Sequence, residues 1–530
     1  MSILARSLIG SRDGTPEGTG FRAVNPATGE SLDPQFHSAN IEDVRLAAQL
    51  AADAFPVYAN LSGRARASFL RAIAAKLESI AGSLVERAAR ETALPLPRLQ
   101  GEVGRTCGQL RLFAQVAEEG SWVMARIDRA APDRQPAPKP DIRSMLRPLG
   151  PVVVFGASNF PLAFSVAGGD TASALAAGNP VIVKAHPAHP GTSALVGQAI
   201  RESIRESSLP EGVFSLLFDA GTSVGTQLVQ HALVKAVGFT GSQAAGRILF
   251  DLAVRRAEPI PFFGEMASTN PLFLLPGALA AHGEKIAADL YGSFTMGAGQ
   301  FCTKPGLLFL GAGAPSANFL KVLEEKVSSA TGFTLLTSGI ASSYARQTAS
   351  REQGAKAKLV ARGTAAQSTI PAAASAALFQ TDISTFLDDP NLAEEHFGPS
   401  LLVIPYSHKQ QLLDCARSLS GHLTATIHGT PEDLEEHAEL VRVLETKVGR
   451  IVFNGFPTGV EVNHAMVHGG PYPASTDSRA TSVGSLAIYR FARPVCYQNF
   501  PDEALPEELK NHNPLRIWRL VDGESTKEPS

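Results

Sequence analysis

Short apolar runs alternate with amphipathic or alanine-rich stretches over residues 151–254. Runs of this kind are typical of parallel strands that are buried on both faces and connected by helices. We therefore predict a parallel α/β sheet in this region. The expected strands are residues 151–155, 181–184, 214–218 and 234–240, and the expected helices are residues 171–177, 192–207, 223–230 and one that begins after Gly241 and Ser242.

The flanking regions carry other patterns, and a second α/β pattern follows Glu265. Residues 129–141 are Pro-rich and predict a linker or an extended arm. We expect loops over residues 1–40, and a loop or weak helix over residues 362–379. The remaining predictions are helices at 41–55, 65–94 (one or two helices that end before Pro95 and Pro97), 101–119 and around 286–291, and strands at 271–275 and 306–310.

Composition narrows the class of protein. A chain of 530 residues is too long for one ordinary core, so we expect two or three structural units. The formal net charge of −3 gives no basic bias toward nucleic acid. No apolar run approaches the roughly 20 residues of a membrane span, and the first ten residues predict no signal peptide. Four cysteines in such a chain predict reduced thiols, and we expect a cytoplasmic protein.

Cys302 lies in a segment that suits a reactive thiol. The small residues of GAGQF precede it, and glycines let a substrate approach a sulfur atom closely. A thiolate is both a nucleophile and a good leaving group. A cysteine alone is more often a small buried hydrophobic residue, which is our interpretation of Cys107, Cys415 and Cys496. We predict that Cys302 is the nucleophile and, as a thiolate of low pKa, the cysteine most reactive to alkylation.

Acyl-enzyme chemistry also needs a carboxylate that activates water and an amide N–H that stabilises the oxyanion. Glu265 and Asn159 are the candidates for these two roles. Glu265 stands among apolar residues in FFGEM, where burial would raise the pKa of its carboxyl group and suit a general base. A partly exposed loop glutamate is an equally good interpretation. Asn159 follows the strand at 151–155. It either stabilises an oxyanion together with the backbone N–H of Cys302 or only caps a helix.

Gly241 and Ser242 lie between a predicted strand and a predicted helix. The N-terminus of that helix either holds a phosphate group or is capped in the ordinary way. The chain contains neither G-x-G-x-x-G nor G-x-x-x-x-G-K-[ST]. A dinucleotide would therefore be bound differently from the usual Rossmann loop.

Two further motifs compete with these assignments. Gly221–Gly225 matches the nucleophile elbow G-x-S-x-G after a predicted strand. It would support a serine hydrolase with Ser223 as nucleophile and His231 as base, although chance matches are common in a Gly-rich chain. His464 and His468 have the i, i+4 spacing of a metal pair. They lack the intervening Glu of zinc proteases and are followed by Gly-Gly-Pro, so we predict no metal.

Several phrases together resemble the aldehyde dehydrogenase superfamily over almost the whole chain. They occur in the family's order as VNPATGE, NFP, VIVK, FTGS, GEMASTNP, GQFCT and EEHFGPS. The resemblance explains Gly221–Gly225 as a turn of the cofactor domain, which weakens the hydrolase interpretation. It implies thiohemiacetal formation, transfer of a hydride to nicotinamide and hydrolysis of a thioester. The implied roles are nucleophile for Cys302, deacylation base for Glu265, oxyanion donor for Asn159, ribose ligands for Lys184 (adenosine) and Glu395 (nicotinamide), pyrophosphate contacts for Gly241 and Ser242, and packing beside the nicotinamide ribose for Phe397.

The chain also departs from the family pattern next to Lys184. The acidic residue expected three positions later is replaced by Pro187 in the sequence Lys-Ala-His-Pro. A carboxylate there accepts the ribose hydroxyl and repels a 2′-phosphate, so its loss argues for NADP, with NAD also possible. His186 or His189 could add positive character, although neutral rings are the safer assumption.

The departures resemble one subgroup of the family, which oxidises 2,5-dioxopentanoate to 2-oxoglutarate in the breakdown of sugar acids and hydroxyproline. NADP-dependent long-chain aldehyde dehydrogenases are the alternative. A dicarboxylic product implies a cationic or N–H-rich pocket for the distal carboxylate, but spacing alone does not identify the residue that forms it.

The resemblance also implies a domain organisation of two Rossmann-type parallel-sheet domains and a small β element. We expect a cofactor-binding domain at 1–124 and 146–264 and a catalytic domain at 265–484. Residues 125–145 and 485–530 would form a bridging element that adds strands across a subunit interface. A homodimer or homotetramer is therefore expected.

Overall fold

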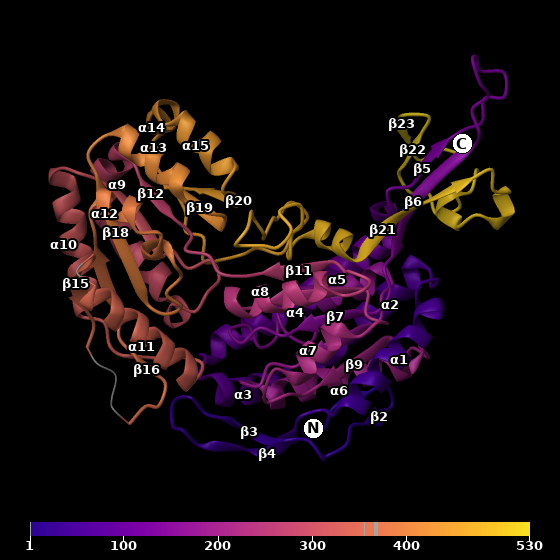
Figure 1. Cartoon of the computed structure of the whole chain (residues 1–530), viewed down its shortest axis with the longest axis horizontal. Coiled ribbons are helices and arrows are strands. Elements are labelled where there is room, and N and C mark those ends of the chain that lie inside the picture. Colours follow the sequence, from indigo (N-terminus) through magenta and orange to yellow (C-terminus); the bar gives the residue numbers. More distant parts are fainter. Residues whose placement is uncertain (1, 355, 365–368) are drawn as a thin grey trace.

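The computed structural model describes residues 2–354, 356–364 and 369–530. Two seven-stranded sheets form two lobes, and a five-stranded sheet forms an arm that projects from the first lobe (Figure 1). Helices cover the faces of both large sheets. The α/β class and the two mainly parallel sheets predicted from the sequence are confirmed. No described helix has both the length and the apolar character needed to cross a membrane.

The first sheet aligns the carboxyl ends of its parallel strands at one edge. Phe155, Lys184, Leu217 and Phe239 are in register, and Thr240 pairs with Glu265. The strand order reverses between β7 and β10, which is where open α/β sheets bind ligands. The order is β11 (Phe262–Glu265), β10 (Ala236–Thr240), β7 (Val152–Phe155), β8 (Val181–Lys184), β9 (Phe214–Leu217), β1 (Leu8–Ile9) and β2 (Arg12–Asp13).

Alternate residues of β7 pack into different cores. Val152 and Val154 belong to one apolar cluster, and Val153 and Phe155 belong to another. Burial on both faces explains why this strand reads as an uninterrupted apolar run. The helices of this lobe are α1 (Ile41–Tyr58), α2 (Gly63–Ser79), α3 (Ala81–Thr92), α4 (Leu96–Glu119), α5 (Gly169–Ala177), α6 (Pro190–Glu206), α7 (Ser223–Gln230) and α8 (Gln243–Val254).

The second sheet follows directly after Glu265. Only its edge strand β15 pairs antiparallel. The order is β15 (Lys358–Arg362), β17 (Ala377–Gln380), β18 (Ser400–Tyr406), β13 (Leu307–Gly311), β12 (Leu272–Leu274), β19 (His422–His428) and β20 (Val448–Phe453). Its helices are α9 (Pro276–Thr295), α10 (Ala314–Ser328), α11 (Ser338–Gln353), α12 (Ile383–Asp388), α13 (Lys409–Ser418), α14 (Pro431–Glu436) and α15 (Ala438–Glu445).

The arm joins the Pro-rich region to the C-terminal segment, as Figure 1 shows. β21 and β6 pair antiparallel over seven residues each, so segments about 350 residues apart in sequence lie side by side. The role of the arm in assembly stays a prediction, and so do the domain boundaries. Its strands are β21 (Ala492–Gln498), β6 (Ile142–Pro148), β5 (Arg126–Asp128), β22 (Arg519–Val521) and β23 (Glu524–Thr526).

Two predicted loops contain strands. Residues 1–40 hold β1 and β2, which extend the first sheet, and a hairpin of β3 (Gly20–Val24) with β4 (Ser31–His37). Residues 362–379 include β16 (Ala373–Ala374), which pairs with β14 (Phe333–Thr334), and most of β17; residues 365–368 lie outside the described part. Both predictions failed because Gly, Pro and Ala have low strand propensity, whereas pairing with neighbouring strands decides the structure.

Candidate active site

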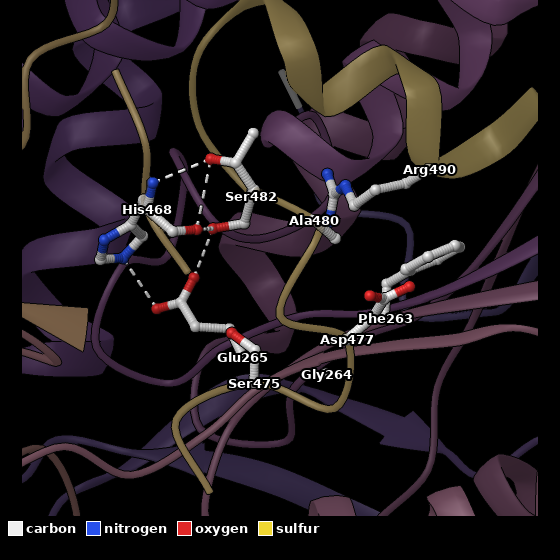
Figure 2. A pocket seen from close by; sticks show the side chains of 10 residues that line it. Phe263, Gly264, Glu265, His468, Ser475, Asp477, Ala480, Ser482 and Arg490 are labelled. Carbon is white, nitrogen blue, oxygen red and sulfur yellow. Dashed lines mark hydrogen bonds and ion pairs between the residues drawn. The ribbon is translucent and has the colours of Figure 1, made fainter. Parts of the chain in front are cut away.

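Glu265, at the end of β11, is held by two side chains from the C-terminal third of the chain (Figure 2). Its Oε1 lies 2.9 Å from Nε2 of His468, and its Oε2 accepts a hydrogen bond of 2.5 Å from the hydroxyl of Ser482. Ser482 and Thr481 also bond the backbone of His468. A cavity of about 20 Å³ adjoins these residues, which is room for one water molecule.

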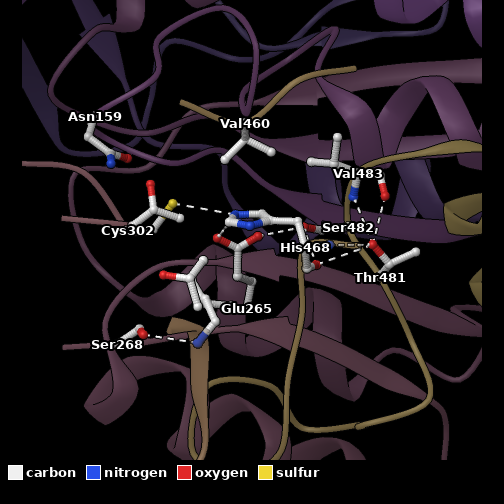
Figure 3. Close-up of polar contacts among 12 residues, drawn as sticks. Asn159, Glu265, Ser268, Cys302, Val460, His468, Thr481, Ser482 and Val483 are labelled. Carbon is white, nitrogen blue, oxygen red and sulfur yellow. Dashed lines mark hydrogen bonds and ion pairs between the residues drawn. The ribbon is translucent and has the colours of Figure 1, made fainter. Parts of the chain in front are cut away.

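Cys302 lies next to this pair (Figure 3). Its Sγ is 3.4 Å from Nε2 of His468. His468 is fully buried, Glu265 is 4% exposed, and Cys302 keeps part of its surface exposed. One imidazole nitrogen thus lies between a thiol and a carboxylate, where a proton can pass between all three groups.

A strained turn presents the thiol. Gly297, Ala298 and Gly299 have φ values of 56°, 58° and 70° in the 3₁₀ turn η3 (Met296–Gly299) that precedes Cys302. A Cβ on Gly299 would lie 2.3 Å from the carbonyl carbon of Gly398. Only glycine fits this contact, so backbone geometry requires glycine at position 299.

Asn270 anchors the far side of the cysteine loop. Its Nδ2 donates to the carbonyl oxygens of Cys302 at 2.8 Å and Lys304 at 2.9 Å. Its Oδ1 accepts hydrogen bonds from the hydroxyls of Ser268 and Thr424. Asn270 is fully buried with φ of 46°, a conformation that asparagine tolerates better than most residues. The sequence contained this residue in GEMASTNP, but its spacing gave it no role.

Asn159 reaches the same loop from the first lobe. Its Nδ2 donates to the carbonyl of Gln300 at 3.0 Å, two residues before Cys302. Its own carbonyl accepts a hydrogen bond of 2.7 Å from Arg98. A carboxamide carries two N–H groups, so one remains beside the thiol after the bond to Gln300.

The electrostatics differ from the sequence-based expectation at both catalytic candidates. Burial, and then the charge of Glu265, raise the pKa of the Cys302 thiol, and Arg105 opposes this rise. Burial alone would raise the pKa of Glu265, but His468 and hydrogen bonds from Ser482 and Cys302 bring it below its ordinary value. The predicted low-pKa thiolate and raised carboxyl pKa are therefore both wrong, because the two groups share one site. In the resting site the thiol is protonated and the carboxylate is ionised.

His468 is the member of the site that sequence reasoning missed. It was considered only as half of a metal pair with His464, but His464 is exposed and lies outside the group. Within the described residues, a carboxylate oxygen of Glu265, the Sγ of Cys302 and a ring nitrogen of His468 all lie within 4.8 Å of one another. The tertiary fold brings these residues together, because 166 residues separate Cys302 from His468 in the sequence. No local spacing could have identified His468.

The predicted cofactor residues lie at the aligned edge of the first sheet. Lys184 ends β8, and the structure gives its ammonium group no ion pair or hydrogen bond among the described residues. Burial lowers the pKa of Lys184, and Asp219 opposes this. Gly241 donates its N–H to the carbonyl of Glu265, and Ser242 is the N-cap of α8. The first turn of α8 is exposed, so its free N–H groups can receive a phosphate.

His186 and His189 carry no charge at neutral pH. Burial lowers the pKa of each ring, and their ring centroids stack at 5.5 Å. Nε2 of His189 lies 2.8 Å from the carbonyl of Ala157, whereas Nδ1 of His186 accepts the N–H of Ala188. These two rings therefore add no positive charge beside Lys184.

Glu395 and Phe397 lie in the loop before β18, next to the Gly299–Gly398 contact. Burial raises the pKa of Glu395, and Lys304 opposes this rise. Burial likewise lowers the pKa of Lys304, whose ammonium group donates to the carbonyls of His396 and Ser400. This loop is thereby attached to the nucleophile loop, two residues after Cys302.

The structure does not assemble a serine hydrolase around Ser223. Its exposed hydroxyl accepts a hydrogen bond from Gln227 at 2.8 Å. His231 ends the same helix, and its Nδ1 accepts the N–H of Leu233. Nothing favours this alternative.

A thiol, a carboxylate and a carboxamide at the edge of an α/β sheet suit chemistry through a covalent acyl-enzyme, and the comparisons identify the class. Residues 13–484 match the sequence profile of the Aldehyde dehydrogenase family. The chain belongs to that family, and it oxidises an aldehyde with an NAD(P) cofactor.

Two curated relatives match nearly the whole chain. It is 47% identical to alpha-ketoglutaric semialdehyde dehydrogenase 2 of Azospirillum brasilense, over 99% of this chain and 100% of the relative. It is 49% identical to alpha-ketoglutaric semialdehyde dehydrogenase of Acinetobacter baylyi, over 93% of each. Lactaldehyde dehydrogenase from Escherichia coli shares the fold, with a TM-score of 0.80 and 21% identity over 93% of this chain and 98% of that chain.

The first prediction concerns thiol ionisation. Because Glu265 raises the pKa of Cys302, alkylation of the wild type by iodoacetamide should accelerate about tenfold per pH unit between pH 7 and 9. Glu265→Gln removes the opposing charge, so the same rate should be reached at lower pH. Mass spectrometry of the alkylated peptide follows the reaction, with Glu86→Gln, an exposed carboxylate, as control. An unchanged pH profile in Glu265→Gln would contradict the electrostatic assignment.

Proposed function

We propose that this chain oxidises 2,5-dioxopentanoate to 2-oxoglutarate and uses NADP at least as well as NAD. The observation that carries the proposal is the Cys302–His468–Glu265 contact, in a chain 47% identical over 99% of its length to a relative named for that semialdehyde. The long-chain aldehyde alternative has no observation in its favour.

The residues at the sheet edge fit a nicotinamide dinucleotide. Lys184 offers a buried cation that has no ion pair or hydrogen bond within the described part of the chain, and the N-terminus of α8 offers free N–H groups beside Ser242. Gly225 packs closely on Phe155, since a Cβ there would lie 2.8 Å from its ring. Glu395 would hold the second ribose, with Phe397 beside it. When bound, the cofactor supplies the two-electron oxidation of the adduct held on Cys302.

The first chemical step needs the thiol to lose its proton. Glu265 or His468 accepts it, because both lie in contact with the sulfur. The S–C bond then forms at the aldehyde carbon, and the carbonyl oxygen becomes an oxyanion. The free N–H of Asn159 donates to that oxygen, and Arg98 keeps Asn159 in place through its backbone.

The second step hydrolyses the thioester. Glu265 accepts a proton from water, the oxygen attacks the thioester carbon, and the C–S bond breaks to release the carboxylate and the thiolate. Ser482 and His468 orient the two carboxylate oxygens for this role. The low pKa of Glu265 keeps it ionised and ready at neutral pH.

The second prediction tests the substrate. The wild type should have a kcat/KM for 2,5-dioxopentanoate at least about tenfold above that for decanal, because only the former carries a carboxylate at the end opposite the aldehyde. Steady-state rates with each cofactor give the comparison. A higher kcat/KM for decanal would contradict the proposal and favour the long-chain aldehyde alternative.

The third prediction separates the reaction step that needs Cys302 from the step that needs Glu265. Glu265→Gln should still form the thioester but hydrolyse it slowly, so stopped-flow absorbance should show a burst of about one reduced cofactor per active site. Cys302→Ser should show neither burst nor turnover while it still binds NADP. Loss of the burst in Glu265→Gln would mean that Glu265 is required to deprotonate the thiol.

The fourth prediction concerns cofactor choice. Pro187→Glu restores a carboxylate near Lys184 and should shift the NADP/NAD ratio of kcat/KM toward NAD by about 1–2 kcal/mol, the size of a charged hydrogen bond. Pro187→Gln is the matched uncharged control and should shift it less. Equal ratios before and after the change would place the determinant outside this loop. A wild-type kcat/KM far higher for NAD would end the NADP proposal.

A further inference from the structure

Helix α4 presents three charged residues on one face, toward the loop that carries Asn159. Arg98, Glu102 and Arg105 follow i, i+4, i+7 spacing, so they lie on neighbouring turns. Oε1 of Glu102 accepts the N–H groups of Leu162 at 2.9 Å and Ala163 at 3.0 Å. Glu102 is therefore engaged in holding that loop, and the structure records no ion pair between it and either arginine.

Arg98 is also engaged. Besides donating to the carbonyl of Asn159, its guanidinium lies 5.0 Å from the ring centroid of Phe160 and 4.7 Å from that of Phe301. Phe301 precedes Cys302. These contacts make Arg98 a positioning residue for the oxyanion donor and the nucleophile loop.

Arg105 has a guanidinium edge without a partner. Its Nη1 donates to the carbonyl of Val460, and its Cζ lies 5.4 Å from the ring centroid of Phe164. Nε and Nη2 are both buried and have no hydrogen-bond partner among the described residues. These two nitrogens form the side-on fork that binds a carboxylate with two parallel hydrogen bonds. Leaving such a donor pair unsatisfied is costly, so a carboxylate placed against it would be stabilised.

This edge belongs to the wall beside the thiol. Phe164 and Val460 share an apolar cluster, and the Phe164 ring centroid lies 6.1 Å from that of His468, the residue in contact with Cys302. Burial lowers the pKa of Arg105, and Cys302, Glu102, Glu461 and Glu265 oppose this. Arg105 is thus connected to the reacting sulfur through the rings of Phe164 and His468.

We propose that Nε and Nη2 of Arg105 bind the carboxylate at the far end of the substrate, the group that spacing alone left unassigned. The inference rests on the proposed function. In 2,5-dioxopentanoate, four C–C bonds of about 1.5 Å separate the aldehyde carbon from the carboxylate carbon, about 5 Å when extended. The aldehyde can then reach Cys302 while the carboxylate neutralises a cation beside the same wall.

The arrangement also explains selectivity against uncharged aldehydes. An alkyl chain on this wall would leave the guanidinium desolvated and unpaired, whereas a carboxylate satisfies both nitrogens and the charge. Arg105 is accordingly a specificity residue that contacts substrate and takes no part in proton transfer.

The test compares Arg105→Met with wild type on 2,5-dioxopentanoate and on pentanal, an uncharged aldehyde of the same length, at saturating NADP. The variant should lose about ten- to hundredfold in kcat/KM for 2,5-dioxopentanoate, the range of a charged hydrogen-bonded pair, and less than about threefold for pentanal. Arg105→Lys should recover part of the loss. Competitive inhibition by glutarate, an unreactive dicarboxylate, should weaken by a similar factor.

Two further variants separate the explanations. Arg111→Met removes an exposed arginine of the same helix, paired with Glu78 at 2.6 Å, and should leave both substrates unchanged. Arg98→Met should lower the rates of both substrates alike, since it acts through Asn159. If Arg105→Met leaves the ratio of kcat/KM for 2,5-dioxopentanoate to kcat/KM for pentanal unchanged, the inference is overturned and the proposed function stays intact. If the wild type itself prefers pentanal, the proposed function fails, and glutarate inhibition alone then decides whether Arg105 binds carboxylates.

Discussion

The contact of one buried carboxylate with a thiol and an imidazole governs the chemistry of this protein. Glu265, Cys302 and His468 come from the first sheet, the nucleophile loop and the C-terminal third. Their charges are interdependent, because an ionised Glu265 opposes ionisation of Cys302 and is itself stabilised by His468. The two lobes must therefore be docked before any of the three groups has its working protonation state. Folding and reactivity are coupled through this contact.

The sequence predicted well those features that depend on local periodicity or on contiguous phrases. The buried strand at 181–184 and the helix at 223–230 match the observed bounds, since each reads as a continuous pattern between turn residues. Cys302, Glu265 and Asn159 were found because distinctive neighbours surround them, and the structure brings all three to one loop system.

Features that depend on partners distant in the chain were missed. The role of His468 depends on a contact across 166 residues, and Arg105 is recognisable only by which of its nitrogens lack partners. The direction of both pKa shifts was wrong for the same reason. Burial was visible in the apolar neighbours of Glu265, but the imidazole and hydroxyl that reverse its effect were not.

The contact between Gly299 and Gly398 has a mechanical consequence. Two residues without side chains touch backbone to backbone, one in the turn that presents the thiol and the other in the loop that carries Glu395. No side chain lies between them to absorb a shift, so a displacement of one loop is transmitted to the other almost undiminished. Lys304 connects the same two loops, because its ammonium group donates hydrogen bonds to the carbonyls of His396 and Ser400. The position of the sulfur is thus tied to that of the loop that carries Glu395, so a substitution that shifts one loop is expected to shift the other.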